Sequence, residues 1–235
     1  MRSKRLVSHP DLPVPVLLCA IRSARRMRLR LDERERHLKL THPIGIRASA
    51  ALSWAATQSC WVNEQLRRSL PAVPLVPGAT IPIEGEEVEL RWAEAEARVP
   101  ALGPGALVCG GRKETFPRRI EQFLKRRAVE TLSRETAEIS GRAGCRATSV
   151  TVGDARTRWG SCSSSGRIRY NWRLILAPPE VLRFVVAHEV AHLRHLDHGA
   201  RFKALERELF GGDIRAAEAL LRSSGPRLRR IGLGG

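Results

Sequence analysis

The chain has 235 residues, of which 43% are hydrophobic and 28% charged, and its formal net charge is +17. This length can supply the core of one large domain or two small ones, and five scattered cysteines with no C-x-x-C pair argue against a disulfide framework or a cysteine zinc site. The charge permits association with nucleic acid, nucleotides or other polyanions through a basic surface, although a generally arginine-rich composition would also produce it.

The N-terminal segment has basic residues ahead of a short apolar stretch, as a signal peptide would. Pro15 interrupts that stretch, and arginines follow it where a small-residue cleavage site would stand. No apolar run in the sequence approaches the 18 or so residues that a membrane-spanning helix needs. We therefore expect a cytoplasmic protein without a membrane span.

Residues 1–110 are predicted to form a β-rich region with one helix. Residues 13–21 read as a strand, and residues 25–43 alternate apolar and polar side chains as a half-buried hairpin does, with the turn at 32–36. Helical spacing follows over 49–70, and residues 79–102 read as further short strands.

Residues 111–235 are predicted to form the catalytic region. A long amphipathic helix is expected over 114–144, a strand over 145–154, and a hairpin over 157–176 that turns at 163–166. Helices are expected over 177–196, 200–210 and 213–224, followed by a basic, frayed tail. Helices and strands are segregated along the chain, which indicates an α+β fold.

The sequence His188-Glu189-Val190-Ala191-His192 is an H-E-x-x-H motif. On a helix the two histidines lie one turn apart on the same face, so both imidazoles can bind one zinc ion. Glu189 can then act as the catalytic base toward a zinc-activated water. A surface helix with incidental histidines is the alternative, but the apolar neighbours of this motif favour a water-excluding site.

A third ligand is expected just beyond this helix, where His195 and His198 compete. His195 lies seven residues after His188, about 10.5 Å along a helix, which is too far for one zinc ion to be shared easily. His198 precedes Gly199, where the chain can turn back, so His198 is favoured. Glu206 and Glu208 are alternative ligands, although a solvated helix face explains them as well.

Residues 157–202 closely resemble the YgjP-like metallopeptidase family, through "RWGSCSS", "NWRLILAPPEV", "VVAHEVAHL" and "DHGARF". The front half, including "CWVNEQL", is similar too, so the resemblance covers most of the chain. It implies a zincin-like core, zinc held by His188, His192 and His198, and Glu189 as base, with a more distant relation to SprT-like proteases. Asp197 and Gly199 depart from the Asn and Ser common in the family, which affects only the surroundings of the ligands.

In zincin-type folds an edge strand above the metal pairs with an extended peptide substrate. The hairpin that begins at Arg158 is the candidate here, and Gly160 would permit close approach of a backbone. Substrate-binding candidates are therefore Arg158, Trp159, Gly160 and Arg173, although core packing is the more ordinary role for the tryptophan and solvation for the arginines. Tyr170, the chain's only tyrosine, is a candidate donor to the oxyanion.

Three functions remain open at this point. The leading one is a zinc metallopeptidase that cleaves peptide bonds. A nucleotide or phosphoanhydride hydrolase would use the same zinc site, with arginines neutralising phosphates. A nucleic-acid-associated protein would carry either a structural zinc or a protease, but a structural zinc usually has four protein ligands and only three good ones are visible.

Overall fold

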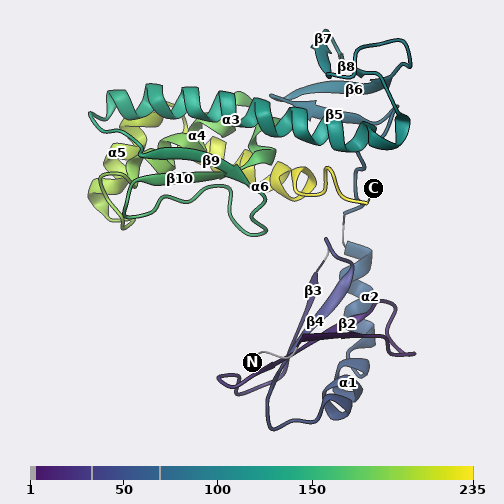
Figure 1. Cartoon of the computed structure of the whole chain (residues 1–235). Helices are drawn as coiled ribbons and strands as arrows, with labels where there is room; N and C mark the ends of the chain where they lie inside the picture. Colours follow the sequence, from purple (N-terminus) through teal and green to yellow (C-terminus); the bar gives the residue numbers. More distant parts are fainter. Residues whose placement is uncertain (1–3, 33, 69, 235) are drawn as a thin grey trace. The chain divides into compact units, whose positions relative to one another are not determined.

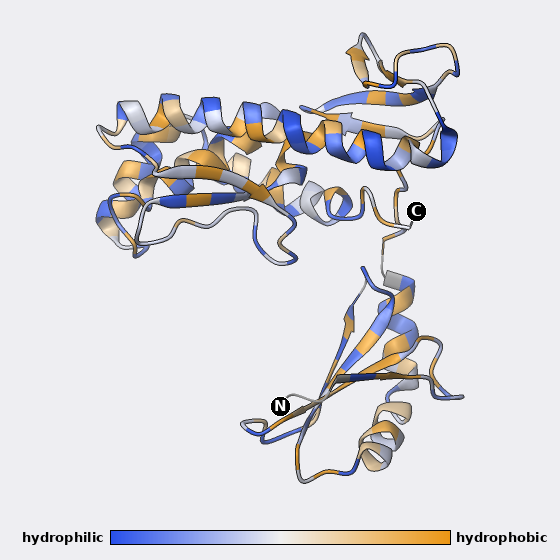
Figure 2. Cartoon of the chain, in the orientation of Figure 1, coloured by the Kyte–Doolittle hydropathy of each residue, from blue (hydrophilic) through white to orange (hydrophobic). Residues whose placement is uncertain are grey.

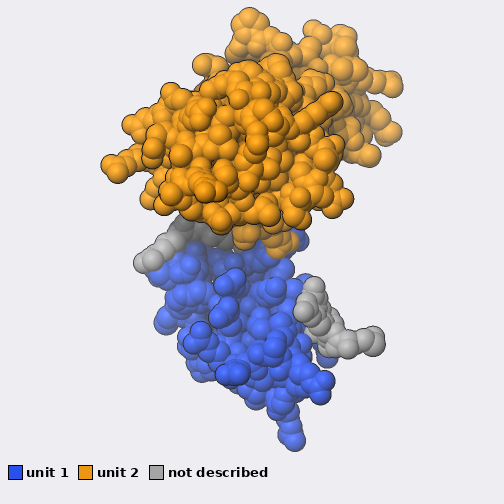
Figure 3. Space-filling model, turned by 90° about the vertical axis from the view of Figure 1, so that its left-hand side faces the viewer, with its two compact units in different colours: residues 1–71 blue, residues 72–235 orange. Residues whose placement is uncertain are grey.

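The computed structural model describes residues 4–32, 34–68 and 70–234, and the fold is α+β, as expected (Figure 1). Contacts divide the chain into two compact units, residues 1–71 and 72–235, which Figure 3 shows in two colours. The boundary expected near residue 110 therefore falls inside the second unit. The strands of residues 80–109 pack against the long helix that follows them. Because they share a core with that helix, the boundary lies before these strands, at residue 71.

The first unit is a four-stranded sheet covered on one face by two helices. The strands β1 (Lys4–Val7), β2 (Val16–Ile21), β3 (Arg28–Asp32) and β4 (His37–Pro43) lie in the order β1-β2-β4-β3. The expected β3–β4 hairpin is present and antiparallel. The single helix expected over 49–70 is two helices, α1 (Ala48–Ala56) and α2 (Ser59–Arg68), because the Thr57 hydroxyl donates to the Trp54 carbonyl and ends the first.

The second unit opens with a sheet of the same design. The strands β5 (Thr80–Ile83), β6 (Glu86–Trp92), β7 (Ala101–Gly103) and β8 (Ala106–Cys109) lie in the order β5-β6-β8-β7. The strand directions match as well: the central pair is parallel and both outer pairs are antiparallel in each sheet. Helices follow the last strand of each sheet. The chain thus contains a structural repeat that its sequence does not reveal.

The rest of the second unit follows the β5–β8 sheet. Its elements are η1 (Lys113–Thr115), α3 (Phe116–Arg142), β9 (Ser149–Gly153), β10 (Arg167–Asn171), η2 (Trp172–Leu176), α4 (Pro179–Ala191), α5 (Ala200–Phe210) and α6 (Ile214–Leu228). Helix α3 buries Ile120, Leu124 and Leu132 in a core shared by the β5–β8 sheet and by α4. None of the described helices is both long and apolar enough to cross a bilayer.

The C-terminal segment is ordered, which corrects the expectation of a frayed tail. Helix α6 continues through Pro226 to Leu228, and Ile231 beyond it is 1% exposed. Ile231 forms a bridge with Val73, and its carbonyl accepts a hydrogen bond from the buried Arg173 guanidinium. Burial of apolar side chains at the end of the chain therefore outweighs its basic composition.

Candidate active site

Helix α4 carries the H-E-x-x-H motif and is almost entirely buried. Val181, Val185, Val186 and Val190 are all at most 4% exposed, so apolar contacts fix the helix within the core. The helix ends at Ala191 with His192 as its C-cap, earlier than expected, and the chain turns through residues 193–199 into α5. This turn brings the side chain of His198 back toward the helix.

The three expected ligands meet. One ring nitrogen each of His188, His192 and His198 lies within 4.8 Å of the other two, and this is a metal-competent cluster in the described part of the chain. The Nε2 atoms of His188 and His198 are 3.4 Å apart. Tetrahedral zinc with bonds of about 2.0–2.1 Å separates its ligand nitrogens by roughly 3.3 Å, so the pair has the spacing that the ion requires.

Hydrogen bonds from the far side of two rings select the ligand nitrogens. His188 Nδ1 lies 2.7 Å from Glu206 Oε1, and His192 Nδ1 lies 3.0 Å from the His195 carbonyl oxygen. Because both partners are acceptors, each Nδ1 carries the proton and donates it, and each Nε2 keeps a lone pair for a metal.

Glu206 thus orients the His188 ring. The sequence offered it as a ligand itself, but in the structure its carboxylate is engaged by the His188 ring. The second alternative, Glu208, is exposed on α5 and uses its backbone carbonyl to accept from Arg142. His195 contributes its carbonyl to the site, while its ring is not part of the cluster.

The charges around the rings shift their pKa values in opposite directions. Burial opposes protonation of His188, but the hydrogen bond to Glu206 and the nearby Glu189 charge outweigh it, so the His188 pKa is raised. The pKa of His192 is lowered, chiefly by burial and also by the neighbouring histidines. The pKa of His188 therefore depends on the two neighbouring carboxylates, Glu206 and Glu189.

Phe202 forms a wall of the cluster that sequence reasoning did not identify as part of the site. Its ring centroid lies 5.1 Å from His188, 4.5 Å from His192 and 4.7 Å from His198, and the side chain is 1% exposed. Phe202 and Glu206 are four residues apart on α5, so both face α4. Their i,i+4 spacing on the helix that follows the third histidine was the only available signal in the sequence.

Glu189 is a buried carboxylate held ready for proton transfer. The residue is 5% exposed, and its Oε2 has no hydrogen-bond partner within the described chain. Burial raises its pKa to about 7, although the charges of His188 and Arg158 act in the opposite direction. A carboxylate with this pKa can both take and return a proton near neutral pH.

Gly160 passes directly beside Glu189. A β-carbon built on Gly160 would lie 2.3 Å from Glu189 Oε1 and 2.6 Å from its Cδ, distances that no side chain tolerates. Absence of a side chain at Gly160 is therefore a condition for the observed position of the carboxylate. Close approach was expected at this glycine, but of substrate backbone, and the structure shows close approach of the Glu189 carboxylate.

The segment around Gly160 forms an edge of the β9–β10 sheet. Ser161 exchanges both backbone hydrogen bonds with Arg169, and the Trp159 carbonyl accepts from Asn171. In an antiparallel pair the intervening residues direct their amide and carbonyl groups away from the partner strand. Gly160 and Cys162 therefore present their backbone groups on the free edge. Burial raises the pKa of the Cys162 thiol to about 11, so this residue is no nucleophile at neutral pH.

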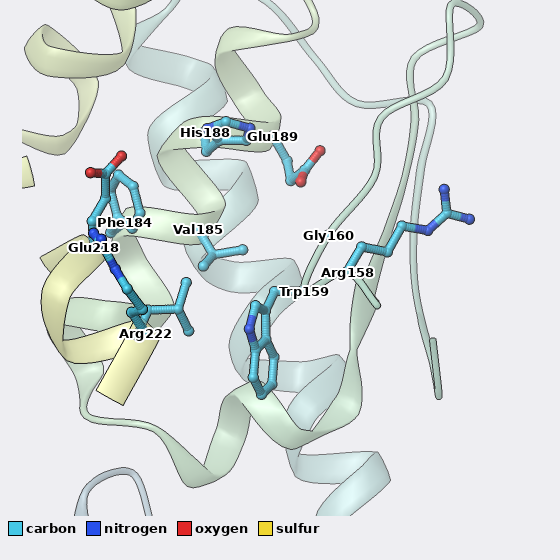
Figure 4. Close-up of a pocket in the computed structure, with 10 residues that line it drawn as sticks. Arg158, Trp159, Gly160, Phe184, Val185, His188, Glu189, Glu218 and Arg222 are labelled. Atoms are coloured by element: carbon cyan, nitrogen blue, oxygen red, sulfur yellow. The ribbon is translucent and has the colours of Figure 1, made fainter. Parts of the chain in front are cut away.

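A pocket of about 520 Å³ adjoins His188 and Glu189 (Figure 4). Figure 4 shows Phe184, Val185 and Trp159 around it, with Glu218 and Arg222 of α6 on one side. The lining residues come from three elements: the 158–160 segment, α4 and α6. They are Arg158, Trp159, Gly160, Phe184, Val185, His188, Glu189, Glu218, Leu221 and Arg222. The contribution of α6 was not foreseen, because helical spacing alone does not show which cavity a helix face adjoins.

Two residues expected at the site are elsewhere. Arg173 is 2% exposed, and its guanidinium is bound to Asp154 and to the Ile231 carbonyl, so it holds the C-terminal segment and does not line the pocket. The Tyr170 hydroxyl is buried against the Thr136 hydroxyl at 3.0 Å, which removes it as an oxyanion donor. Asp197 accepts a hydrogen bond from the Gly199 amide and so caps the turn before α5.

A buried helix with two histidines and a carboxylate, and a third histidine returned by the next turn, define a class of α+β proteins built to hold a catalytic metal. Residues 25–224 match the family model described as YgjP-like, metallopeptidase domain. The chain therefore belongs to the YgjP-like family, an enzyme family of metallopeptidases. No curated protein matches the chain, and no solved structure does.

Proposed function

We propose that this protein is a zinc-dependent metallopeptidase with His188, His192 and His198 as zinc ligands and Glu189 as the catalytic base. The observation that carries the proposal is the convergence of the three rings beside a buried carboxylate that has a free oxygen. When bound there, zinc supplies Lewis-acid polarisation of the scissile carbonyl and acidifies a water. Three protein ligands leave the open position that catalytic zinc sites need.

The chain's own residues then have distinct roles in peptide hydrolysis. Glu206 and the His195 carbonyl hold two ligand rings in place, as described above. Glu189 accepts a proton from the attacking water and delivers it to the leaving nitrogen, so that a C–O bond replaces the C–N bond. Its buried position keeps other proton donors away during this transfer.

We infer that substrate binds in an extended conformation along the edge at Gly160 and Cys162. Free amide and carbonyl groups on a sheet edge bind a peptide by adding it as a further strand. Trp159 continues this edge into the 520 Å³ pocket, where Arg158 also contributes. A peptide paired there would place a side chain in the pocket and its backbone beside Glu189.

A second candidate function is hydrolysis of a phosphoanhydride. Arg158 and Arg222 both line the pocket, and guanidinium groups bind phosphates well. The pocket is also lined by the carboxylate of Glu218, which would repel a phosphate, and by apolar side chains. Both features favour a peptide substrate. We also infer a reducing, cytoplasmic location, which the five free cysteines support.

Metal analysis combined with substrate screening tests this proposal. We expect one zinc per chain, loss of zinc in His198→Ala, and turnover of unstructured peptides that disappears in Glu189→Gln while zinc is retained. Nucleoside triphosphates form the second arm of the screen. Turnover of triphosphates alone would support the second candidate, and a zinc-loaded protein that cleaves neither substrate would refute both.

A further inference from the structure

The first unit carries more of the net positive charge than its size explains, because it has few acidic residues. Residues 1–71 contain 14 Lys or Arg and 5 Asp or Glu, which gives +9 of the chain's +17. The second unit is more than twice as long and carries the remaining +8. The charge of the chain is therefore concentrated in the unit that has no part in the metal cluster.

Strand register assigns part of this charge to one face of the sheet. Val16, Leu18, Leu38 and Leu40 point to the face that α1 and α2 cover, and all four are at most 6% exposed. Along β3 and β4 the alternating residues point to the opposite face, and hydropathy alternates accordingly in Figure 2.

We define the basic face by Arg28 and Arg30 on β3 and Lys39 on β4, all three of which are exposed. Arg30 lies directly opposite Lys39, and Arg28 lies two residues along the same strand, about 6.8 Å away at the usual rise of a strand. Within the described residues no ion pair neutralises any of the three.

More positive charge continues at one end of this sheet. The connection between β2 and β3 leaves the sheet after Ile21 and returns at Arg28. It carries Arg22, Arg25 and Arg26, and all three side chains are exposed.

The structural repeat supplies an internal comparison. In the second sheet, the strands β7 and β8 correspond to β3 and β4, and neither carries a charged residue. The outer face of β6, the counterpart of β2, carries Glu87, Glu89 and Arg91, while Val88 and Leu90 are buried. Arg91 is paired with Glu89 at 2.7 Å, and Glu87 lies 3.5 Å from Arg227. Two sheets of one design in one chain thus differ in charge, so an arginine-rich composition does not account for the basic face.

From this comparison we propose that the basic face of the first unit binds the phosphate backbone of a nucleic-acid duplex. Exposed guanidinium and ammonium groups at strand spacing on a rigid sheet match a regular row of phosphates. On the described strands β3 and β4 this face has no Phe, Trp or Tyr on which bases could stack, which disfavours single strands and predicts binding without sequence preference. The unit would hold the enzyme near proteins bound to nucleic acid.

The salt dependence of binding tests this proposal on the full-length protein. Fluorescence anisotropy with a labelled DNA duplex of arbitrary sequence gives the dissociation constant at several salt concentrations. Three phosphate contacts contribute about 2.7 to the slope of log K against log salt, or roughly 40-fold between 50 and 200 mM salt. We expect the triple variant Arg28→Ser, Arg30→Ser, Lys39→Ser to lose that part of the slope.

A charge-matched control removes three exposed arginines of the second unit, Arg118, Arg126 and Arg146, each replaced by Ser. We expect this variant to keep nearly all of the wild-type slope. We expect the double variant Arg28→Lys, Arg30→Lys to bind as the wild type does, because it keeps both positive charges. Far-UV circular dichroism verifies that each variant is folded. The proposal would be overturned if both triple variants lost the same part of the slope, or if the wild-type protein did not bind the duplex. The proposal would also be overturned if the Arg28, Arg30 and Lys39 variant lost binding to anionic phospholipid vesicles but bound the duplex as the wild type does.

Discussion

The substitution Gly160→Ala tests the placement of Glu189 most directly. The added β-carbon would lie 2.3 Å from Glu189 Oε1, whereas non-bonded atoms need about 3.5 Å, so the carboxylate must move by about 1.2 Å. A displacement of about 1 Å in a catalytic group costs roughly 100-fold in rate. We expect kcat on a fluorogenic peptide to fall about 100-fold, while bound zinc stays at the wild-type level because no ligand is touched.

A second glycine provides the matched control. Gly141 lies in α3, and a β-carbon there would meet nothing within 4 Å. Gly141→Ala should leave kcat unchanged and stabilise the fold by about 0.5–1 kcal/mol, as alanine does in a helix. The reasoning would be refuted by a Gly160→Ala enzyme with kcat within twofold of wild type. Loss of zinc in that variant would show that the site has collapsed and that the effect is not local to the carboxylate.

Three further substitutions probe the supports of the site. Glu206→Ala removes the acceptor that orients His188, so the zinc affinity measured by competition with a chelator should fall about 10–100-fold; an unchanged affinity would contradict that role. Phe202→Ala leaves a cavity beside the three rings and should lower the free energy of unfolding of the zinc-free protein by about 3–5 kcal/mol in urea. A much smaller loss would mean that the ring is not packed in the core. Asp213→Ala removes the side chain that accepts from the Ala216 amide and should cost about 1 kcal/mol with kcat unchanged, whereas altered kcat would mean that the α6 terminus acts on the pocket.

The core of the site could be predicted from the sequence because its geometry is local. Residues four apart on a helix must share a face, which brought His188 and His192 together without knowledge of the fold. The choice of His198 needed only the length of the turn and the position of Gly199. These inferences depend on a few residues of backbone, and the structure brings the three rings together as expected.

The remainder of the site depends on contacts between distant segments. Arg173 follows a tryptophan in a hairpin and resembles a substrate-binding residue, but the C-terminal segment packs over it and takes its hydrogen bonds. The α6 side of the pocket has the same origin, since Glu218 and Leu221 reach it only because α6 packs on α4. The repeated sheets were missed for a different reason, because strand order and direction leave no local pattern in a sequence.

The position of Glu206 decides between two kinds of metal site. As a fourth ligand it would close the coordination shell, and a closed shell is typical of structural zinc. Instead its Oε1 lies 2.7 Å from His188 Nδ1, on the side of the ring opposite the nitrogen that faces His198. One carboxylate oxygen in that position cannot also reach the centre of the triad, so in the proposed site Glu206 supports the His188 ring and leaves the fourth position open. Glu189 follows His188 directly on α4, and its Oε2 has no hydrogen-bond partner within the described chain, so in the proposed site the open position and the base lie together.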